Sequence, residues 1–490
     1  MTLKVLKFGG SSVGSAEALR RAAGIVRDEL PSGGLVVVSA LKGTTDQIID
    51  ACAAAGRGDL PLAQSILAAL QARHLGVATE LGHLEAVRPA WEPLFARLEQ
   101  LLTGMAMLGE ATARARDAAL AVGETLSANL AAFCFGATFQ DVREVMKTDS
   151  RFGKARPQLD ELRTAAAPWR QAFSDGALWV TQGFLGASPE GISTTLGRGG
   201  SDTSATLLGE ALDAQEVQIW TDVDGVLTAD PSLVKEAQPI PQMSLGEAEA
   251  LSAFGAKVLH ADSLAPGGRA GFRLVVANTL RPGASRTVIL PHPPSRPAGA
   301  VTSVAYKEGI SLLRFPASAG LEPPLEAARS LEEAGALRFG LIASPAGTLL
   351  AVRPETHAAT EVLGTLASTG AASGLTCESG WAVVALVGEG LRADPVAALR
   401  HLAALGQEPV GGLLTGSSTV SIAFLVPESR LGDLIPRLHD RCVLGTQDSG
   451  VLGTQDSGVL GTQDHRVLGT RDHRVPGTSI QGVPGTPEQP

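Results

Sequence analysis

The chain has few cysteines, a single tyrosine and no run of basic residues. Its cysteines, Cys52, Cys134, Cys377 and Cys442, lie far apart and form no C-x-x-C pair, so the sequence indicates neither a disulfide framework nor a zinc site. This cysteine usage is typical of a reducing cytoplasm, which is the location we expect. The formal net charge is −10, and an acidic chain without basic clusters is a poor candidate for binding nucleic acid.

Features of several other protein classes are missing as well. The first ten residues, MTLKVLKFGG, have glycines where a signal peptide needs an apolar segment. No apolar run in the sequence approaches the length of a membrane span, so we expect no membrane partner. The P-loop string G-x-x-x-x-G-K-[ST] is missing, and Asp202 stands where the last glycine of a G-x-G-x-x-G dinucleotide site would be.

The patterns that are present predict an α/β protein. The strand-like LKVLKF precedes Gly9 and Gly10, and the helical pattern SAEALRRAAGIVRDEL precedes LVVVSA, an apolar run typical of a strand buried on both faces. Such a β–loop–α–β start favours a parallel sheet covered by helices. Residues 60–135 predict a mostly helical excursion. Further strands are expected at 177–187, 216–223 and 272–279.

The second half of the chain has a different pattern. A helix is predicted at 244–259, beginning with a capping box of Ser244 and Glu247, and the Pro-rich residues 291–299 predict a linker. Over 300–441, four strand-like runs alternate with two helical stretches, which indicates two small α+β units. From 443 to 490 the chain consists of octads such as VLGTQDSG. They have too few bulky apolar residues for a core, so we expect disorder, with a repeat solenoid as the alternative.

Two glycine-rich stretches have the composition of anion sites. KFGGSSVG places Lys7 ahead of paired glycines and a helix start, and amides with an ammonium suit phosphate oxygens. In TTLGRGGSDTSA the glycines let a ligand approach the backbone before a helix N-terminus, and Arg198 adds a planar fork for a carboxylate or phosphate. Taken singly, ordinary turns with solvated cations explain both stretches equally well, and Asp202 is explained by a helix cap.

Three further segments carry polar groups that a substrate could use. SALKGTTD follows a buried strand at the sheet edge where α/β proteins bind ligands, and Ser39, Thr44 and Thr45 can hydrogen-bond a carboxylate. Glu124 is predicted at the front of an apolar helix, where it serves either the helix dipole or an ammonium ligand. In FGAKVLH, Lys257 is a surface lysine in the simpler interpretation. Loop polarity explains the first segment as well as a ligand does.

Together, and in this order, the motifs resemble the aspartokinases of the amino-acid kinase superfamily. The strings that carry the resemblance through residues 4–290 are KFGGSSVG, GMAMLGE, VGETLSANL, VREVMKTDSRFG, VTQGFLG, TTLGRGGSDTSA, WTDVDGVLTADP and FGAKVLH. TSVAYKEGISLLRF and LLTGSSTVSIAFLVPE resemble the paired ACT domains of that family. The resemblance covers about residues 1–441 and leaves out the octad tail.

The resemblance implies a three-layer α/β/α sandwich with a mostly parallel sheet over residues 1–292, followed by paired ACT regulatory domains over 300–441. The implied reaction converts ATP and L-aspartate to 4-phospho-L-aspartate and ADP, the first step of lysine, threonine and methionine biosynthesis. Magnesium would be held largely by phosphate oxygens, so no metal site made of protein ligands is expected.

The resemblance also implies roles for individual residues. Lys7 would bridge the phosphates, Arg198 would hold the α-carboxylate of aspartate, and Asp202 would order the lysines and the substrate. The other implied substrate contacts are Ser39, Thr45, Glu124 (to the α-ammonium), Gly199, Gly200 and Ser201. The other implied nucleotide contacts are Gly9, Gly10, Thr221, Asp222, Leu227, Ser232 and Lys257.

The sequence departs from the family pattern at two nucleotide positions. Leu227 and Ser232 stand where the family usually has an aromatic residue and an arginine, and KGTTD is a shuffled form of the usual GKTTD. In the regulatory region the resemblance implies inhibition by lysine, threonine or both, sensitive to Ser417 and Ser418, and a homodimer or dimer of dimers formed through the ACT units.

Two alternatives differ in function. One is another amino-acid kinase, acting on glutamate, N-acetylglutamate or a nucleotide; the expected ammonium-binding role of Glu124 and the ACT pair argue against it. The other is a non-catalytic ligand sensor with a decayed kinase domain; retention of Lys7, Arg198, Asp202 and Lys257 argues against decay.

Overall fold

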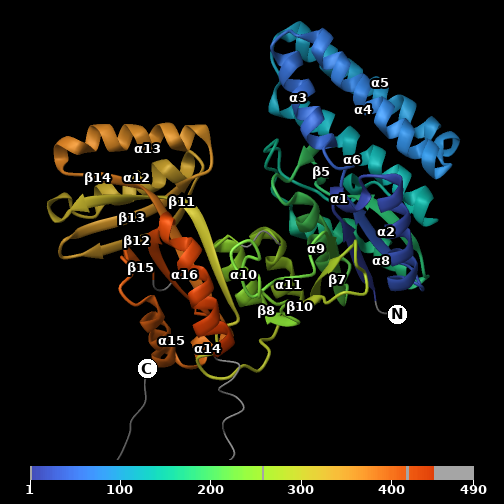
Figure 1. The fold of residues 1–490 in the computed structure, drawn as a ribbon. Helices are drawn as coiled ribbons and strands as arrows, with labels where there is room; N and C mark the ends of the chain where they lie inside the picture. The colour runs from blue at the N-terminus through green and yellow to red at the C-terminus, as the bar shows by residue number, and fades with distance from the viewer. Residues whose placement is uncertain (1–2, 256–258, 415–418, 446–490) are drawn as a thin grey trace, which may run out of the picture. The chain divides into compact units, whose positions relative to one another are not determined.

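The computed structural model describes residues 3–255, 259–414 and 419–445 (Figure 1). Lys257, Ser417, Ser418 and the octads beyond Gly445 lie outside these residues.

An eight-stranded sheet forms the centre of residues 3–290, with the strand order β3-β4-β2-β1-β7-β9-β10-β8. All neighbouring strands are parallel except β9 and β10, which confirms the expected mostly parallel sheet. The strands are β1 (Lys4–Phe8), β2 (Gly34–Val38), β3 (Thr138–Phe139), β4 (Leu178–Gln182), β7 (Glu216–Thr221), β8 (Gln242–Ser244), β9 (Arg273–Asn278) and β10 (Thr287–Leu290).

Helices cover both faces of this sheet. Neighbouring strand residues point to opposite faces, and Val5 and Leu6 accordingly belong to two separate apolar clusters. One cluster joins the sheet to α1 (Gly10–Val13), α2 (Ala16–Glu29), α3 (Thr44–Gly56), α4 (Leu60–Leu81), α5 (Leu84–Leu108) and α6 (Ala113–Phe135). The other joins it to α7 (Leu159–Ala165), α8 (Ala167–Ser174), α9 (Gly200–Ala211) and α10 (Leu245–Ala253), with α11 (Ala265–Ala270) against α9. The expected α/β/α sandwich is therefore confirmed.

The predicted helical excursion over residues 60–135 is observed as α4, α5 and α6. Each of these helices ends at a glycine in the left-handed region, Gly82, Gly109 and Gly136, where a side chain would be strained. The expectation that no segment approaches a membrane span is wrong for α6, which is long and apolar enough by length and composition. The apolar window of α6 is 67% buried inside the protein, as in the core helix of a globular domain.

The capping box predicted at Ser244 is present at the start of α10. The helix is shorter than predicted, because it ends at Ala253 and Gly255 takes φ +110°, outside the helical region. Glu247 is fully buried, and besides its own helix it serves the following region: its Oε1 accepts the Thr302 hydroxyl at 2.5 Å and the Glu389 N–H at 3.0 Å.

Residues 303–444 form a second sheet, six-stranded and antiparallel, with the order β12-β13-β11-β14-β16-β15. Its strands are β11 (Ser303–Pro316), β12 (Ala336–Ser344), β13 (Gly347–Pro354), β14 (Thr376–Val387), β15 (Gly412–Leu414) and β16 (Ser421–Pro427). Its helices are α12 (Glu322–Glu333), α13 (His357–Gly370), α14 (Glu389–Ala393), α15 (Pro395–His401) and α16 (Leu431–Leu438) (Figure 1).

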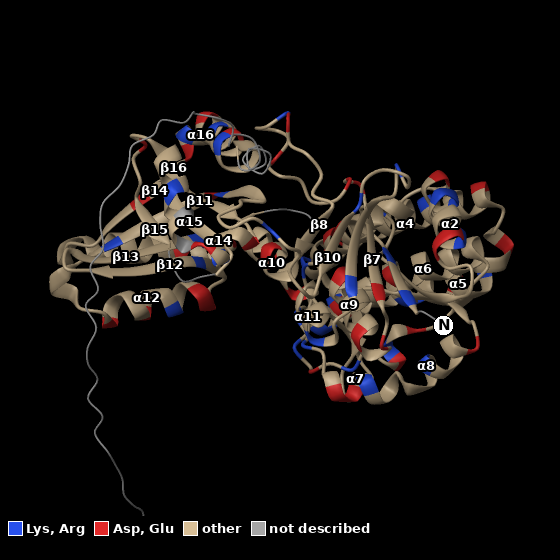
Figure 2. Cartoon of the chain, turned by 90° about the horizontal axis from the view of Figure 1, so that it is seen from below, with Lys and Arg blue, Asp and Glu red and all other residues tan. Residues whose placement is uncertain are grey.

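The two halves of this sheet, β11–α13 and β14–α16, repeat the order strand, helix, strand, strand, helix, if α14 and α15 are taken as one helical step. They are the two α+β units that the sequence indicated, and β11 and β14 join them into one sheet. The predicted start of the tail at residue 443 is wrong, since Cys442 and Val443 are fully buried in an apolar cluster with α16. Basic and acidic side chains are interspersed along both regions (Figure 2).

Candidate active site

The carboxyl ends of three neighbouring parallel strands bring candidate residues to one edge of the first sheet. Lys7 lies near the end of β1, level with Val37 of β2 and Ile219 of β7. Ser39 follows β2 and Thr221 ends β7. Ligands of open α/β sheets bind at this edge, so the strand order supports the expected position of the site.

Lys7 and Asp202 form the ion pair at the centre of this edge. The Lys7 Nζ lies 2.6 Å from the Asp202 Oδ1, and both side chains are largely shielded from water. A Cβ at Gly9 would lie 3.3 Å from the same Nζ, so the ammonium sits directly over the glycine backbone. The expectation that Asp202 caps its helix is wrong, because the N-cap of α9 is Gly199, and Asp202 lies inside the first turn.

Glu124 lies in the middle of α6, which corrects the expectation that it stands at the front of a helix. It is buried, and its Oε2 accepts the backbone N–H of Ala40 at 2.7 Å. Burial raises the pKa of Glu124 to about 8, although the Ala40 N–H and the charge of Lys7 oppose the shift. A carboxyl with this pKa is largely protonated at neutral pH until a cation arrives beside it.

The loop after β2 is held against α6 by a second bond, from the Ser127 hydroxyl to the Ser39 carbonyl at 2.7 Å. Gly43 takes φ +80° as the N-cap of α3, and Thr44 follows as its first residue. The Thr44 Oγ1 is buried and has no hydrogen-bond partner among the residues that the structure describes. Thr45 is half-buried beside it. The loop thus presents hydroxyls at the start of a helix close to Glu124.

The glycine-rich loop before α9 is shaped by close packing as well as by backbone conformation. Gly199 has φ +71°, and a Cβ there would lie 2.6 Å from the Cβ of His260. A Cβ at Gly200 would lie 2.7 Å from the Phe184 ring. Arg198 is exposed, and within residues 3–255, 259–414 and 419–445 it makes no hydrogen bond or ion pair. Its guanidinium is therefore available to an anionic ligand.

Ser201, the remaining substrate candidate in this loop, packs directly on the chain after β4. A Cβ at Gly183 would lie 2.7 Å from the Ser201 Cβ, so only glycine allows this approach. The first turn of α9 is thereby fixed against the end of β4, beside the Lys7–Asp202 pair.

Asp117 is a site-building residue that the sequence interpretation missed. It is buried in α6 and accepts three hydrogen bonds: from the Gly153 N–H at 2.9 Å, the Thr195 N–H at 2.9 Å and the Thr195 hydroxyl at 2.8 Å. Thr195 ends β6 (Ser193–Thr195), which pairs with β5 (Leu185–Ala187) and leads into the Arg198 loop. Its position seven residues before Glu124, on the same face of an apolar helix, is the signal that could have identified it.

The candidate nucleotide residues lie along the segment after β7. Thr221 ends the strand, Asp222 is exposed, and their side chains lie 3.3 Å apart. Ser232, which replaces the usual arginine, donates its N–H and hydroxyl to the Asp230 Oδ1 at 2.8 and 2.6 Å. The Leu227 carbonyl accepts the Ser303 hydroxyl at 3.2 Å. Among the described residues no hydrogen bond joins this loop to the Lys7–Asp202 pair.

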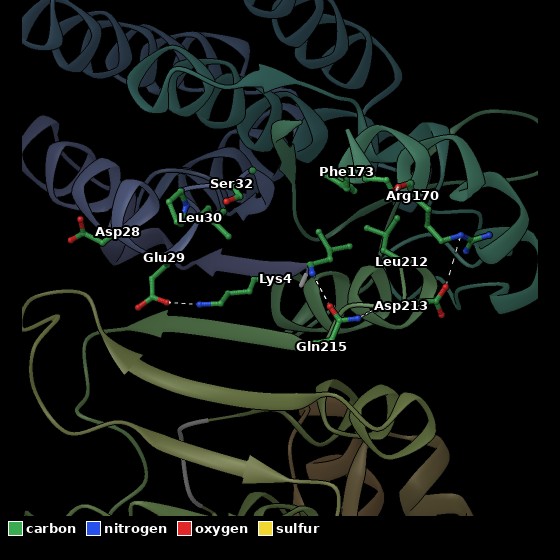
Figure 3. Close-up of a pocket in the computed structure, with 14 residues that line it drawn as sticks. Lys4, Asp28, Glu29, Leu30, Ser32, Arg170, Phe173, Leu212, Asp213 and Gln215 are labelled. Atoms are coloured by element: carbon green, nitrogen blue, oxygen red, sulfur yellow. Dashed lines mark hydrogen bonds and ion pairs between the residues drawn. The ribbon is translucent and has the colours of Figure 1, made fainter. Parts of the chain in front are cut away.

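A hollow of about 680 Å³ opens at the opposite edge of the sheet (Figure 3). It lies where β1, β2 and β7 begin, and Lys4, Glu29, Arg170 and Asp213 are among its lining residues. Lys4 pairs with Glu29 at 3.1 Å, and none of the candidate catalytic residues lines the hollow. Because ligands of parallel sheets bind at the carboxyl edge, we assign the chemistry to the Lys7 side.

Comparisons with known proteins agree with this geometry. The amino acid kinase family matches residues 2–278. An aspartokinase of Chlamydia trachomatis is 39% identical over 284 residues, which span 56% of this chain and 62% of that protein. The lysine-sensitive aspartokinase 3 of Escherichia coli is 30% identical over 462 residues, which span 89% of this chain and 98% of that protein.

Two crystal structures of E. coli aspartokinase III have similar folds. The complex with lysine and aspartate, described as the T-state, has a TM-score of 0.75 and 28% identity, and covers 90% of this chain and 99% of that chain. The complex with aspartate and ADP, described as the R-state, has a TM-score of 0.74 and 29% identity, and covers 89% and 99%. The similarity therefore extends through both sheets.

Proposed function

The chain belongs to the amino acid kinase family, and we propose that it is an aspartate kinase, which transfers the γ-phosphoryl group of ATP to the side-chain carboxylate of L-aspartate. The products would be 4-phospho-L-aspartate and ADP. The observation that carries the proposal is the Lys7–Asp202 pair at the carboxyl edge of the sheet, with Glu124 buried close to it.

The proposed mechanism depends on positioning and charge. The acceptor is already a carboxylate, so little general-base work is required, and neutralising the phosphates as charge redistributes dominates catalysis. Lys7 would contact the phosphates beside the Gly9 and Gly10 amides. Asp202, 2.6 Å from the Lys7 ammonium, holds that ammonium in place.

Three further groups would orient aspartate. The exposed guanidinium of Arg198 would hold the α-carboxylate in a bidentate pair, with Gly199, Gly200 and Ser201 around it. Glu124 would lose its proton when the α-ammonium arrives and pair with it. The hydroxyls of Ser39 and Thr45 would contact the rest of the substrate.

The nucleotide would occupy the side of Thr221, Asp222, Leu227 and Ser232, with Lys257 also expected there although it lies outside the described residues. ATP as co-substrate is supported by the relative bound to aspartate and ADP. Among the residues described, no group of three or more His, Cys, Asp or Glu side chains is arranged to hold a metal ion. We therefore propose that magnesium accompanies ATP and is held mainly by phosphate oxygens.

The second sheet is proposed to be a pair of ACT units that bind a feedback amino acid, lysine or threonine or both. Support comes from the lysine-sensitive relative, whose sequence is matched over 98% of its length, and from the structure of that enzyme with lysine. Ser417 and Ser418 are proposed to lie in the regulatory site, outside the described residues. We also propose a homodimer or dimer of dimers and a cytoplasmic location.

The proposal is tested by measuring ADP release from ATP with aspartate, glutamate and N-acetylglutamate offered separately to the purified chain. ADP release that depends on aspartate supports an aspartate kinase. Release that depends on another acceptor contradicts the substrate, and binding of lysine or threonine without ADP release would favour the ligand sensor.

A further inference from the structure

Tyr306 of β11 contacts both segments that are proposed to border the nucleotide. It is the only tyrosine of the chain. Its hydroxyl donates to the Asp230 Oδ2 at 3.2 Å, in the loop between β7 and β8. Its carbonyl oxygen fills the place of the missing Cβ of Gly255, in the segment that leads to Lys257. One residue of the regulatory sheet thus contacts two segments of the kinase region.

The contact at Asp230 sets the conformation of the loop because both carboxylate oxygens are engaged. Ser232 donates its N–H and its hydroxyl to Oδ1, and Tyr306 donates to Oδ2. Removing the tyrosine hydroxyl would leave a charged acceptor without that donor, and hydrogen bonds to charged groups are the stronger ones.

Other contacts fix the same loop to the regulatory sheet. The Thr228 Oγ1 lies 2.8 Å from the His439 Nε2, and the Val304 N–H donates to the Thr228 carbonyl at 2.9 Å. Ala229 and Val234 are buried in an apolar cluster that includes α16. The stem of the loop belongs to the kinase sheet, since the Val226 N–H donates to the Thr287 hydroxyl at 2.8 Å. Both ends of the loop therefore belong to the kinase sheet, and its middle residues are held against the regulatory sheet.

We propose that Tyr306 is a positioning residue for the nucleotide. Its hydroxyl holds Asp230 and its carbonyl oxygen packs against Gly255, and these contacts keep the two segments that border the nucleotide at the spacing that ATP requires. The proposal rests on the proposed function, which puts the nucleotide beside these segments. A ligand that shifts β11 would then change the affinity for ATP more than the affinity for aspartate.

The test compares Tyr306→Phe with Ser311→Ala. Ser311 lies on the same strand, and the Ser379 hydroxyl, at 3.4 Å, is its side-chain hydrogen-bond partner among the described residues. Each full-length variant is assayed for KM of ATP, KM of aspartate, kcat, ADP affinity by calorimetry, and Tm. We expect Tyr306→Phe to weaken ADP binding and raise the KM of ATP by about three- to tenfold, with the KM of aspartate, kcat and Tm close to wild type. Ser311→Ala should change none of these.

Asp230→Asn and the double variant Tyr306→Phe/Asp230→Asn complete a double-mutant cycle. The cycle tests the proposal even if one of the single variants is less stable than wild type. If Tyr306 acts through Asp230, the double variant should bind ADP no more weakly than the weaker single variant. Unchanged ADP affinity in Tyr306→Phe, additive effects in the double variant, or losses of kcat and Tm in parallel would each overturn the proposal. A wild-type chain that binds ADP but does not phosphorylate aspartate contradicts the proposed substrate only, and the ADP comparison still decides the role of Tyr306.

Discussion

The two sheets of this protein use buried polar groups in different ways. In the parallel sheet, charged or ionisable side chains are buried at the carboxyl edge with a partner, as in the Lys7–Asp202 pair and the Glu124–Ala40 bond. In the antiparallel sheet, the interior of β14 and β16 is apolar, and its ion pairs, such as Arg314–Glu378, are partly exposed. Burying a charge is costly unless it is paired and hydrogen-bonded, so the carboxyl edge of the parallel sheet bears a cost that the apolar strands β14 and β16 avoid.

Removing the charge at the centre of the parallel sheet should have the largest effect on activity. Lys7→Ala should lower kcat by roughly 10²- to 10³-fold with a modest effect on the KM of aspartate, because the ammonium acts mainly on charge that develops during transfer. Steady-state kinetics at saturating aspartate provides the measurement. Activity within a few-fold of wild type would remove Lys7 from the mechanism.

A smaller effect is expected at the exposed cation of the same edge. Arg198→Ala should raise the KM of aspartate by roughly 10- to 100-fold, and Arg198→Lys should not restore it, because a point ammonium cannot reproduce the bidentate fork. The KM of ATP is the internal control and should change little. Normal aspartate binding by the Lys variant would contradict the assignment of the α-carboxylate.

The buried carboxyl of Glu124 should make aspartate binding depend on pH. Only the ionised form of Glu124 attracts an ammonium, and its pKa is about 8, so the fraction of competent enzyme falls as pH drops below that value. We expect the KM of aspartate to rise by about tenfold per pH unit between pH 7 and 6. Glu124→Gln should bind aspartate weakly and lose this slope. A flat profile in the wild type would show that Glu124 does not meet the ammonium.

The smallest effects on activity are expected from truncating the chain at the end of the antiparallel region. Two truncations, a few residues apart, are compared. Ending the chain after Gly445 should leave activity and Tm unchanged, since the octads have no apolar face to dock. Ending it after Arg441 removes the buried Cys442 and Val443 and should lower Tm by several degrees. Thermal unfolding of both forms is the measurement, and equal Tm values would show that burial of these two residues contributes nothing.

The sequence predicted the parallel sheet better than the antiparallel one. Strands β1 and β2 are short apolar runs buried on both faces, and α10 begins with the predicted capping box at Ser244. By contrast β12, an edge strand of mixed exposure, was not predicted. The residues Ala336–Ser344 show neither the alternation of a strand nor the 3.6-residue period of a helix. The end of α10 was misjudged because the apolar pattern continues past the turn at Gly255.

Site residues that belong to a sequence motif were predicted. Residues that only the fold places next to the site were missed. Lys7 and Asp202 were both predicted, and the structure pairs them across almost two hundred positions of sequence. Asp117 and Tyr306 were missed because their partners, Thr195 and Asp230, are distant in sequence. Glu124 was identified but misplaced within its helix, since the start of an apolar helix cannot be located when the preceding segment is also a good helix former.

The carboxylate of Glu247 ties the first region to the second through hydrogen bonds that are shielded from water. It closes the capping box of α10 and also accepts the Thr302 hydroxyl and the Glu389 N–H, in full burial. Separating the regions even slightly would strip a buried charge of two of its donors, which is costly until water can enter and replace them. Small displacements between the two regions at this point are therefore disfavoured, because they would cost hydrogen bonds before water could replace them.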